Sequence, residues 1–282
     1  IDDTSLWVVE RGPEDGFPLL VLHGGPGLDH HEFADYLDPL IDRGIRLCLV
    51  DQRAQGRSPR ADPGTWTLER HAQDVIMLAR ALRLPRYGVL GHSYGAFVAL
   101  QNAVDYPGMT AATIVASGLA GSRWLDRIEA NLAAFEPADL RAQVAASWAR
   151  EAHVRTVEEF AASNHDQWPF HFADPRDPRI AEYEDRTADS VLSPDVLRHF
   201  ATSAYGGIDV EDRLSQVDTP TLVLAGRHDR TCVVEAAEAM AASIPGARLE
   251  VCEHSGHMTF VEEPARFLEV VGDFLAPIAQ GR

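Results

Sequence analysis

The pentapeptide Gly91-His92-Ser93-Tyr94-Gly95 is the first candidate for chemistry. It follows an apolar run at residues 87–90 and precedes a helical pattern at 96–105, so its serine stands on a tight turn from strand to helix. Glycine two residues before and two residues after the serine lets the strand and the helix approach without a Cβ clash. In this setting Ser93 is predicted to be a nucleophile.

A serine hydroxyl is too weak an acid to attack a carbonyl unaided, so the pattern requires a histidine base and an acid that orients it. Asp229 follows the apolar run 221–225 and His257 follows the run 248–252, which places both beyond the carboxyl ends of strands. Among the rivals, Asp218 precedes its strand, and His254 lacks the glycine-flanked loop position. We therefore expect Ser93, His257 and Asp229 to form a catalytic triad.

Such a triad also needs two backbone N–H donors for the oxyanion of the tetrahedral intermediate. Tyr94, directly after the nucleophile, supplies one. The run His23-Gly24-Gly25-Pro26-Gly27 follows the apolar run 18–22, and Gly25 is the expected second donor because no side chain obstructs its N–H. The alternative interpretation of this run is a plain glycine-rich turn.

The elements that must position these residues alternate along most of the chain. Short apolar runs predict strands at 6–10, 18–22, 45–50, 87–90, 112–116, 221–225 and 248–252. Apolar residues at three- and four-residue spacing predict helices at 68–84, 96–105, 233–243 and 264–275. This alternation is typical of an α/β fold with a parallel sheet covered by helices on both faces.

The alternation stops between residues 121 and 207, where the sequence predicts several short helices broken by prolines at 137, 169, 175, 178 and 194. We therefore expect a core domain of residues 1–120 and 208–282 and an insertion of residues 121–207. The insertion is dense in aromatic residues, which either line a lid over the site or form a small core of their own. Trp168 and Tyr205 are candidate substrate-binding residues among them.

Three motifs together resemble a known family. The run 23–27, the run Asp51-Gln52-Arg53-Ala54-Gln55-Gly56-Arg57-Ser58 and the pentapeptide 91–95 resemble those of the prolyl aminopeptidases (proline iminopeptidases), which are α/β-hydrolases. The resemblance spans nearly the whole chain and is weakest in the insertion. It implies an α/β-hydrolase fold with a mostly parallel eight-stranded sheet, a helical cap at 121–207, and the triad and oxyanion donors named above.

The chain departs from this family where the substrate amine is expected to bind. The peptidases hold that amine with glutamates, one of them directly after the triad aspartate, whereas Arg230 follows Asp229 here. Arg230 is therefore a candidate substrate-binding residue that would repel a protonated amine. Glu182 and Glu184 in the insertion are possible substitutes for the family's glutamates, and a solvated acidic helix face is the alternative interpretation. Ala54 also replaces a glycine that is usual in the family.

The composition of the chain excludes several classes of binding partner and cofactor. The 282 residues carry 43 acidic and 25 basic side chains, and the net charge of −18 opposes binding to nucleic acid and to anionic membranes. All the basic residues are arginine, which excludes chemistry that depends on lysine, such as a pyridoxal Schiff base. Three separated cysteines and the histidines at 30, 31, 165 and 171 show no ligand spacing, so neither a metal nor a cofactor is expected. A cytoplasmic location fits this cysteine usage.

These features predict a serine hydrolase that cleaves a small carboxylic ester, lactone or amide through an acyl-enzyme, with a small molecule or short peptide as substrate. Three alternatives stay open: a true prolyl aminopeptidase, an acyltransferase or cofactor-free haloperoxidase, and a receptor that binds a ligand without turnover.

Overall fold

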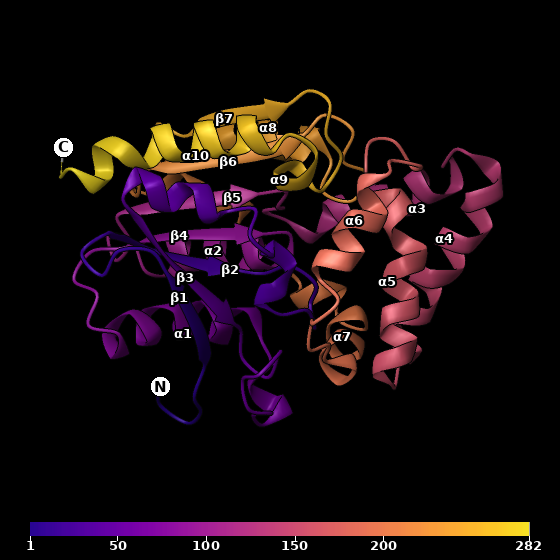
Figure 1. Ribbon diagram of the computed structural model, residues 1–282, viewed down its shortest axis with the longest axis horizontal. Coiled ribbons are helices and arrows are strands. Elements are labelled where there is room, and N and C mark those ends of the chain that lie inside the picture. The colour runs from indigo at the N-terminus through magenta and orange to yellow at the C-terminus, as the bar shows by residue number, and fades with distance from the viewer. Residues whose placement is uncertain (282) are drawn as a thin grey trace.

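In the computed structural model, which describes residues 1–281, one sheet runs through the middle of the molecule (Figure 1). Its strands stand in the order β1 (Trp7–Arg11), β3 (Ile45–Asp51), β2 (Phe17–Leu22), β4 (Gly88–His92), β5 (Ala112–Ala116), β6 (Thr221–Gly226) and β7 (Arg248–Cys252). Within the described residues, every neighbouring pair is parallel except β1 with β3. Each expected run forms a strand whose ends shift by at most about two residues. The α/β fold with a mostly parallel sheet is therefore confirmed.

The sheet has seven strands in residues 1–281, whereas the family resemblance implies eight. The segment before β1 forms turns instead of a further strand. In that segment the N-terminal ammonium of Ile1 donates to the carbonyl of Thr4 at 3.0 Å, and the Asp3 carboxylate accepts hydrogen bonds from Arg53 and Arg70. These contacts hold the segment against the loop after β3 and the helix that follows it, so β1 is the edge of the sheet.

Helices cover both faces of the sheet. Leu20 and Leu22 of β2 face α1 (Leu68–Ala81), α2 (Tyr94–Asp105) and α8 (Val234–Ser243). Leu19 and Val21 point to the opposite face, where α9 (Thr259–Glu262) and α10 (Pro264–Ala279) pack. This two-residue alternation, apolar on both faces, is what a doubly covered strand requires.

Two helix ends differ from expectation. Helix α1 ends at Ala81 instead of residue 84, because Arg83 adopts a φ of +55° and a helix cannot continue through that conformation. Helix α10 continues past residue 275 to Ala279, with Pro277 in its last turn. No helix in the described part of the chain is long and apolar enough to cross a membrane.

Between β5 and β6 the chain forms a group of helices that lies beyond one end of the sheet, on the right of Figure 1. These are α3 (Asp126–Ala133), α4 (Ala138–Arg150), α5 (Val157–His171), α6 (Arg179–Arg186) and α7 (Pro194–Ala201). We call residues 121–207 the cap. An isolated antiparallel bridge between Gly121 and Asp209 closes its base. Pro137, Pro178 and Pro194 stand at helix starts as expected, but Pro169 lies inside the last turn of α5 and does not break it.

The cap's apolar side chains serve two purposes. Phe135 and Phe170 pack with Ile128 and Val144 in a small core of the cap, and Phe160 belongs to a second one. Trp148, Trp168 and Tyr205 instead line a cavity between the cap and the sheet. Both interpretations of the aromatic residues therefore apply, and Phe160 serves both purposes because it also lines the cavity.

Candidate active site

Ser93 stands on the turn between β4 and α2 with a φ of +52° and a ψ of −118°. An L-residue adopts this conformation only when its surroundings hold it there, and such strain is typical of functional turns. A Cβ at Gly91 would lie 2.0 Å from the Gly95 carbonyl oxygen, and a Cβ at Gly95 would lie 2.2 Å from the Leu22 carbonyl oxygen. The two glycines therefore permit the close approach that the turn requires.

Asp229 and His257 meet at the carboxyl ends of β6 and β7. The Nδ1 atom of His257 lies 2.7 Å from Oδ2 of Asp229, and both side chains are buried. The other oxygen of Asp229 accepts hydrogen bonds from the N–H groups of Thr231 and Cys232 at 2.8 and 2.9 Å. Burial opposes the charge on Asp229, but the facing imidazole and these donors outweigh it and lower its pKa. Since Nδ1 donates to the carboxylate, Nε2 of a neutral His257 is a proton acceptor.

The rival residues lie elsewhere. Asp218 is exposed at the opposite end of β6, where its carboxylate accepts a hydrogen bond from the N–H of Gly108 at 2.9 Å. His254 is also exposed, and its N–H donates to Glu263. Neither rival lines the cavity described below.

The two expected oxyanion donors border the same cavity as Ser93 and His257. Gly25 adopts a φ of +103°, and a Cβ there would lie 2.9 Å from the nitrogen of Gly27. The N–H of Gly25 has no hydrogen-bond partner within residues 1–281. Tyr94 is the first residue of α2, a position whose N–H has no acceptor inside its own helix. Both donors are thus available to a ligand.

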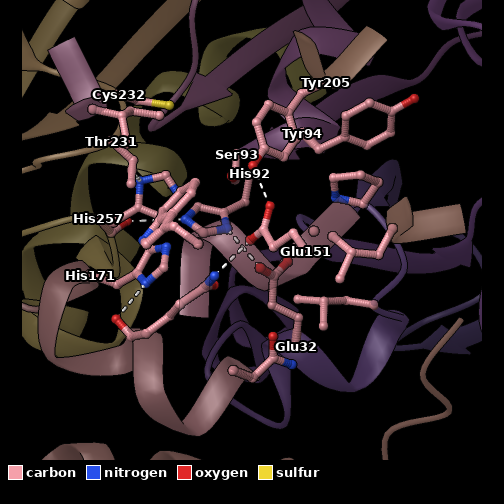
Figure 2. Close-up of a pocket in the computed structure, with 18 of the residues that line it drawn as sticks. Glu32, His92, Ser93, Tyr94, Glu151, His171, Tyr205, Thr231, Cys232 and His257 are labelled. Atoms are coloured by element: carbon pink, nitrogen blue, oxygen red, sulfur yellow. Dashed lines mark hydrogen bonds and ion pairs between the residues drawn. The ribbon is translucent and has the colours of Figure 1, made fainter. Parts of the chain in front are cut away.

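The cavity has a volume of about 90 Å³ and lies between the sheet and the cap (Figure 2). It brings together Ser93, His257, Gly25 and Tyr94 from the core with Trp168 and Tyr205 from the cap. It is also lined by residues that the sequence did not single out for the site, which include Glu32, Trp148, Glu151, Gln167 and His171. His92, at the end of β4, borders it as well.

Arg230 does not line this cavity, so its expected role in binding the substrate is wrong. Its guanidinium donates to three backbone carbonyls at the end of α5, those of Phe170 at 3.2 Å, Phe172 at 2.6 Å and Ala173 at 3.0 Å. It also lies 5.2 Å from the centre of the Phe135 ring. Arg230 therefore ties the loop of Asp229 to the cap instead of presenting a charge to the site.

Glu151 is the carboxylate that the cap places in the cavity. It follows α4, is buried, and accepts hydrogen bonds from the Tyr205 hydroxyl and from Gln167 Nε2 at 2.7 Å; Figure 2 shows its contact with Tyr205. Burial raises the pKa of Glu151 despite these two bonds. Glu182 and Glu184 instead pair with Arg186 and His165 outside this cavity, so neither substitutes for an amine-binding glutamate. No local pattern in the sequence distinguishes Glu151 from other acidic residues near helix ends.

His171, the last residue of α5, faces the catalytic side of the cavity. Its ring centre lies 5.2 Å from that of His257, and its carbonyl accepts a hydrogen bond from the N–H of His257 at 2.6 Å. Burial, followed by the charge of His257, lowers the pKa of His171 to about 3. Its Nδ1 lies 3.1 Å from the carbonyl oxygen of Gln167, which can only accept. The cap thus supplies a neutral imidazole beside the expected base.

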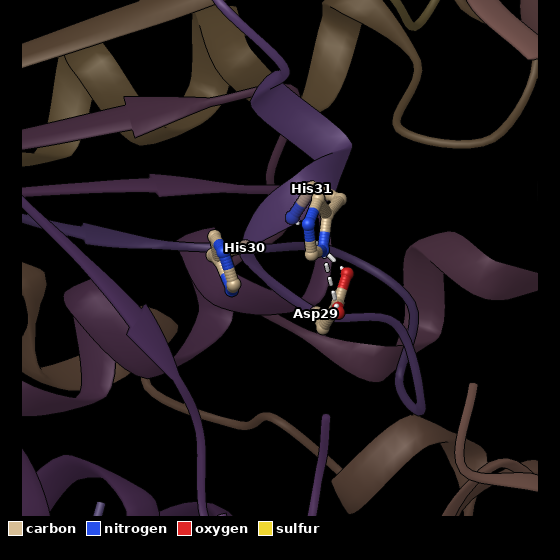
Figure 3. Close-up of side chains that lie close together, drawn as sticks. All are labelled: Asp29, His30 and His31. Atoms are coloured by element: carbon tan, nitrogen blue, oxygen red, sulfur yellow. Dashed lines mark hydrogen bonds and ion pairs between the residues drawn. The ribbon is translucent and has the colours of Figure 1, made fainter. Parts of the chain in front are cut away.

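Asp29, His30 and His31 lie close enough together to suggest a metal site (Figure 3). Their ligand atoms are already engaged, since His30 Nδ1 faces Asp51 at 2.6 Å and His31 Nδ1 faces Asp29 at 2.8 Å. Asp29 also accepts from Arg57 at 3.4 Å, and a guanidinium beside the carboxylate opposes a cation. The second such cluster combines Cys232 with Asp229 and His257 of the expected triad, and burial raises the pKa of the Cys232 thiol well above its ordinary value. Neither donor set fits a metal ion.

Comparison with known proteins agrees with this architecture. A proline iminopeptidase from Heyndrickxia coagulans is 28% identical over 272 residues, which cover 93% of this chain and 92% of that protein. A putative carbamate hydrolase from Variovorax paradoxus is 27% identical over 279 residues, covering 95% of each chain. The crystal structure of a proline iminopeptidase from Mycobacterium smegmatis matches with a TM-score of 0.77 at 26% identity, over 99% of this chain and 97% of that one.

The resemblance seen in the three motifs is therefore confirmed over most of the chain. The model of the alpha/beta hydrolase fold family matches residues 18–264, which include every expected triad and oxyanion residue. The chain belongs to the alpha/beta hydrolase fold family and is a hydrolase of that family.

Proposed function

We propose that this protein is a serine hydrolase that cleaves a small carboxylic ester, lactone or amide through an acyl-enzyme. The observation that carries this proposal is the 2.7 Å contact between His257 and Asp229 at a cavity that Ser93 also lines. Ser93 Oγ attacks the carbonyl carbon while His257 Nε2 takes its proton, and Asp229 stabilises the resulting imidazolium. The N–H groups of Gly25 and Tyr94 hold the oxyanion.

The remaining steps need only water. His257 returns the proton to the leaving alcohol or amine as the C–O or C–N bond breaks, which leaves the acyl group on Ser93. A water molecule then attacks the acyl carbon while His257 takes its proton. The bond between the acyl carbon and Ser93 Oγ breaks as His257 returns this proton to Oγ, and the carboxylic acid leaves. An acceptor other than water would make the same acyl-enzyme an acyl donor in a transfer reaction.

In this proposal the cap, residues 121–207, is a lid domain over a core domain of residues 1–120 and 208–282. The small cores formed by Phe135 and Phe160 support a unit that packs partly on itself, and Trp148 and Trp168 close the cavity from above the sheet. A lid that excludes water strengthens each electrostatic contact at the reacting carbonyl.

An organophosphonate tests this assignment. We expect it to label Ser93 stoichiometrically, because its tetrahedral adduct resembles the intermediate that the two N–H donors hold. Peptide mapping by mass spectrometry identifies the labelled residue. A label on another residue, or none on folded protein, would overturn the proposal.

A second candidate is aminopeptidase activity on substrates with a free N-terminal amine, such as prolyl amides. Glu151 favours it, because a buried carboxylate without a cationic partner in the described structure complements an ammonium group. The repulsion expected from Arg230 has no basis, since that guanidinium is turned away to the carbonyls of the cap. Two of the three relatives reported above are named proline iminopeptidases, which supports this candidate.

Matched esters separate the two candidates. One ester carries a free α-amine and the other carries the same amine acylated, so the reacting bond is held constant. If the protein is an aminopeptidase, kcat/KM is at least about tenfold higher for the free amine, which corresponds to about 1.4 kcal/mol of amine recognition. Equal or lower kcat/KM for the free amine excludes this candidate and leaves a hydrolase of uncharged substrates.

A further inference from the structure

Glu32 and His92 form a buried pair that the proposed mechanism does not use. Glu32 lies on the short helical turn His30–Phe33 after the oxyanion loop, and His92 directly precedes Ser93. The Oε1 atom of Glu32 lies 2.9 Å from Nδ1 of His92, and both side chains are at most 3% exposed. Two ionisable groups so far from water are costly unless each has a structural or chemical use.

The pair contacts three of the four loops of the proposed catalytic machinery, all but the loop of Asp229. Glu32 Oε2 accepts a hydrogen bond from the N–H of Gly24 at 2.6 Å, directly beside Gly25. His92 Nε2 lies 3.1 Å from the carbonyl oxygen of His257. Through these contacts one pair joins the oxyanion loop, the turn of Ser93 and the histidine loop.

The fit around Glu32 is tight. A Cβ at Gly24 would lie 2.6 Å from Glu32 Oε1 and 3.0 Å from the Cβ of Ser93. The Glu32 carboxylate thus packs closely against the oxyanion loop at the point where this loop lies beside Ser93. The rings of Phe33 and Phe260 pack in T-shaped contacts with the ring of His92, at centroid distances of 6.4 and 5.1 Å.

Counting protons assigns a charge to the pair. A carbonyl oxygen only accepts, so Nε2 of His92 carries a proton, and an ionised Glu32 requires a second proton on Nδ1. Burial opposes both charges, but the facing partner and its hydrogen bonds outweigh burial, lowering the pKa of Glu32 and raising that of His92. His23 favours the charged form of Glu32, and Asp229 favours the charged form of His92. Tyr183 also acts on Glu32 and His171 on His92, and the ring centre of His257 lies 4.9 Å from that of His92.

We propose that Glu32 and His92 are positioning residues, an ion pair that holds the oxyanion loop in register with Ser93 and the histidine loop. The inference rests on the proposed function, because it assigns the pair its role through the triad and the oxyanion donors. Its effect is on kcat, since loosening the Gly24–Gly25 segment moves an N–H donor away from the oxyanion, which forms only in the transition state.

Two substitutions of Glu32 distinguish its role in positioning the loop from the effect of its charge. Glu32→Ala leaves the N–H of Gly24 and Nδ1 of His92 without partners, and we expect kcat to fall about 100-fold with KM changed by less than about threefold. Glu32→Gln keeps the shape, because its oxygen can accept from Gly24 and its amide can donate to a neutral His92. We expect it to restore kcat to within about fivefold of the wild type. Glu182→Gln, on the exposed face of α6, is the matched control and leaves kcat unchanged.

Nitrogen NMR measures the protonation state of His92, which a general loss of stability would not change. We expect His92 to be doubly protonated at pH 7 in the wild type and singly protonated in Glu32→Gln. A neutral His92 in the wild type, or a Glu32→Ala variant that keeps kcat within about twofold while Ser93→Ala is inactive, overturns the inference. If Glu32→Ala does not fold, the NMR and kcat of Glu32→Gln decide. An active Ser93→Ala variant instead contradicts the proposed function, so the two failures are distinguishable.

Discussion

Two regions build the cavity by different physical means: the cap, and the loops that carry Gly25, Ser93, Asp229 and His257, which we call the rim of the sheet. At the rim, backbone conformation fixes where Ser93 and Gly25 lie. Both residues have positive φ, and there is no space for a Cβ at Gly91 or Gly95. In the cap, contacts between side chains fix the position of a group. Glu151, for example, is held by hydrogen bonds from Gln167 and Tyr205. Gly91 and Gly95 therefore have no room for a larger residue, whereas the position of Glu151 depends on which side chains surround it.

This difference separates the reaction from the choice of substrate. The groups that the proposed mechanism needs to break and form bonds, Ser93, His257, Asp229 and the oxyanion donors, all belong to the rim. Many of the groups that can meet the rest of the substrate, among them Glu151 and Trp148, belong to the cap, although Leu28, Phe97 and Met258 of the core line the cavity as well. We therefore expect rim substitutions to reduce turnover of every substrate and cap substitutions to change the ranking of substrates.

The largest expected effect tests the rim. Ser93→Ala and His257→Ala each lower kcat by about 10⁴-fold or more, and the double variant loses little beyond that, because the two residues act as one unit. Turnover of a chromogenic ester measures all three variants, with circular dichroism as the control for folding. Losses that add in the double variant show that the two residues do not work together.

The acid of the triad gives the next largest effect. Asp229→Asn lowers kcat by roughly 1,000-fold or more, because an amide at this position favours the wrong tautomer of His257. Asp218→Asn is the matched control, since it is an exposed aspartate at the other end of the same strand and leaves kcat unchanged. The reverse pattern reassigns the acid to Asp218.

What could be predicted from the sequence follows the same division. Strand 112–116 and the Ser93 turn were predictable, because a buried strand and a strained turn each restrict the residue types around them. Glu151 was missed because its hydrogen bond to Tyr205 joins residues 54 apart, and no local pattern records such a contact. Arg230 was misplaced for a related reason: the N–H of Thr231 bonds to the Asp229 carboxylate, and the chain turns so that the adjacent guanidinium meets α5.

Substitution of Glu151 in the cap tests whether the cap selects the substrate without taking part in the reaction. If the free amine is preferred, Glu151→Gln lowers kcat/KM for the amine-bearing ester about tenfold, because the neutral amide keeps the shape but not the charge that faces the ammonium. The N-acylated ester keeps its kcat/KM within about twofold. A fall of equal size for both esters contradicts the division, because Glu151 would then act on the reaction itself. Kinetics on the two matched esters at one pH give the result.

The last prediction concerns stability at the boundary between the two regions, where Glu262 accepts hydrogen bonds from the N–H of Gly256 in the histidine loop and of Ala173 in the cap, both at 2.8 Å. Burial raises the pKa of Glu262 from its ordinary 4.5 to about 7, against these two bonds. The folded state therefore binds more protons than the unfolded state between these pH values, and the contribution of Glu262 to stability is full below pH 4.5 and is lost as pH rises through 7.

The loss across this window is at most about 3.5 kcal/mol, since each pKa unit corresponds to about 1.4 kcal/mol. Glu262→Gln cannot titrate, so the difference in unfolding free energy between wild type and variant should shift in favour of the variant from pH 4.5 to 7. Urea unfolding at several pH values measures that difference, in which the titrations of other groups cancel. Glu263→Gln, at the adjacent residue, is the matched control and leaves the slope in place. A difference that stays constant with pH means that Glu262 has the same pKa in the folded and the unfolded protein, and the boundary then carries no pH dependence of its own.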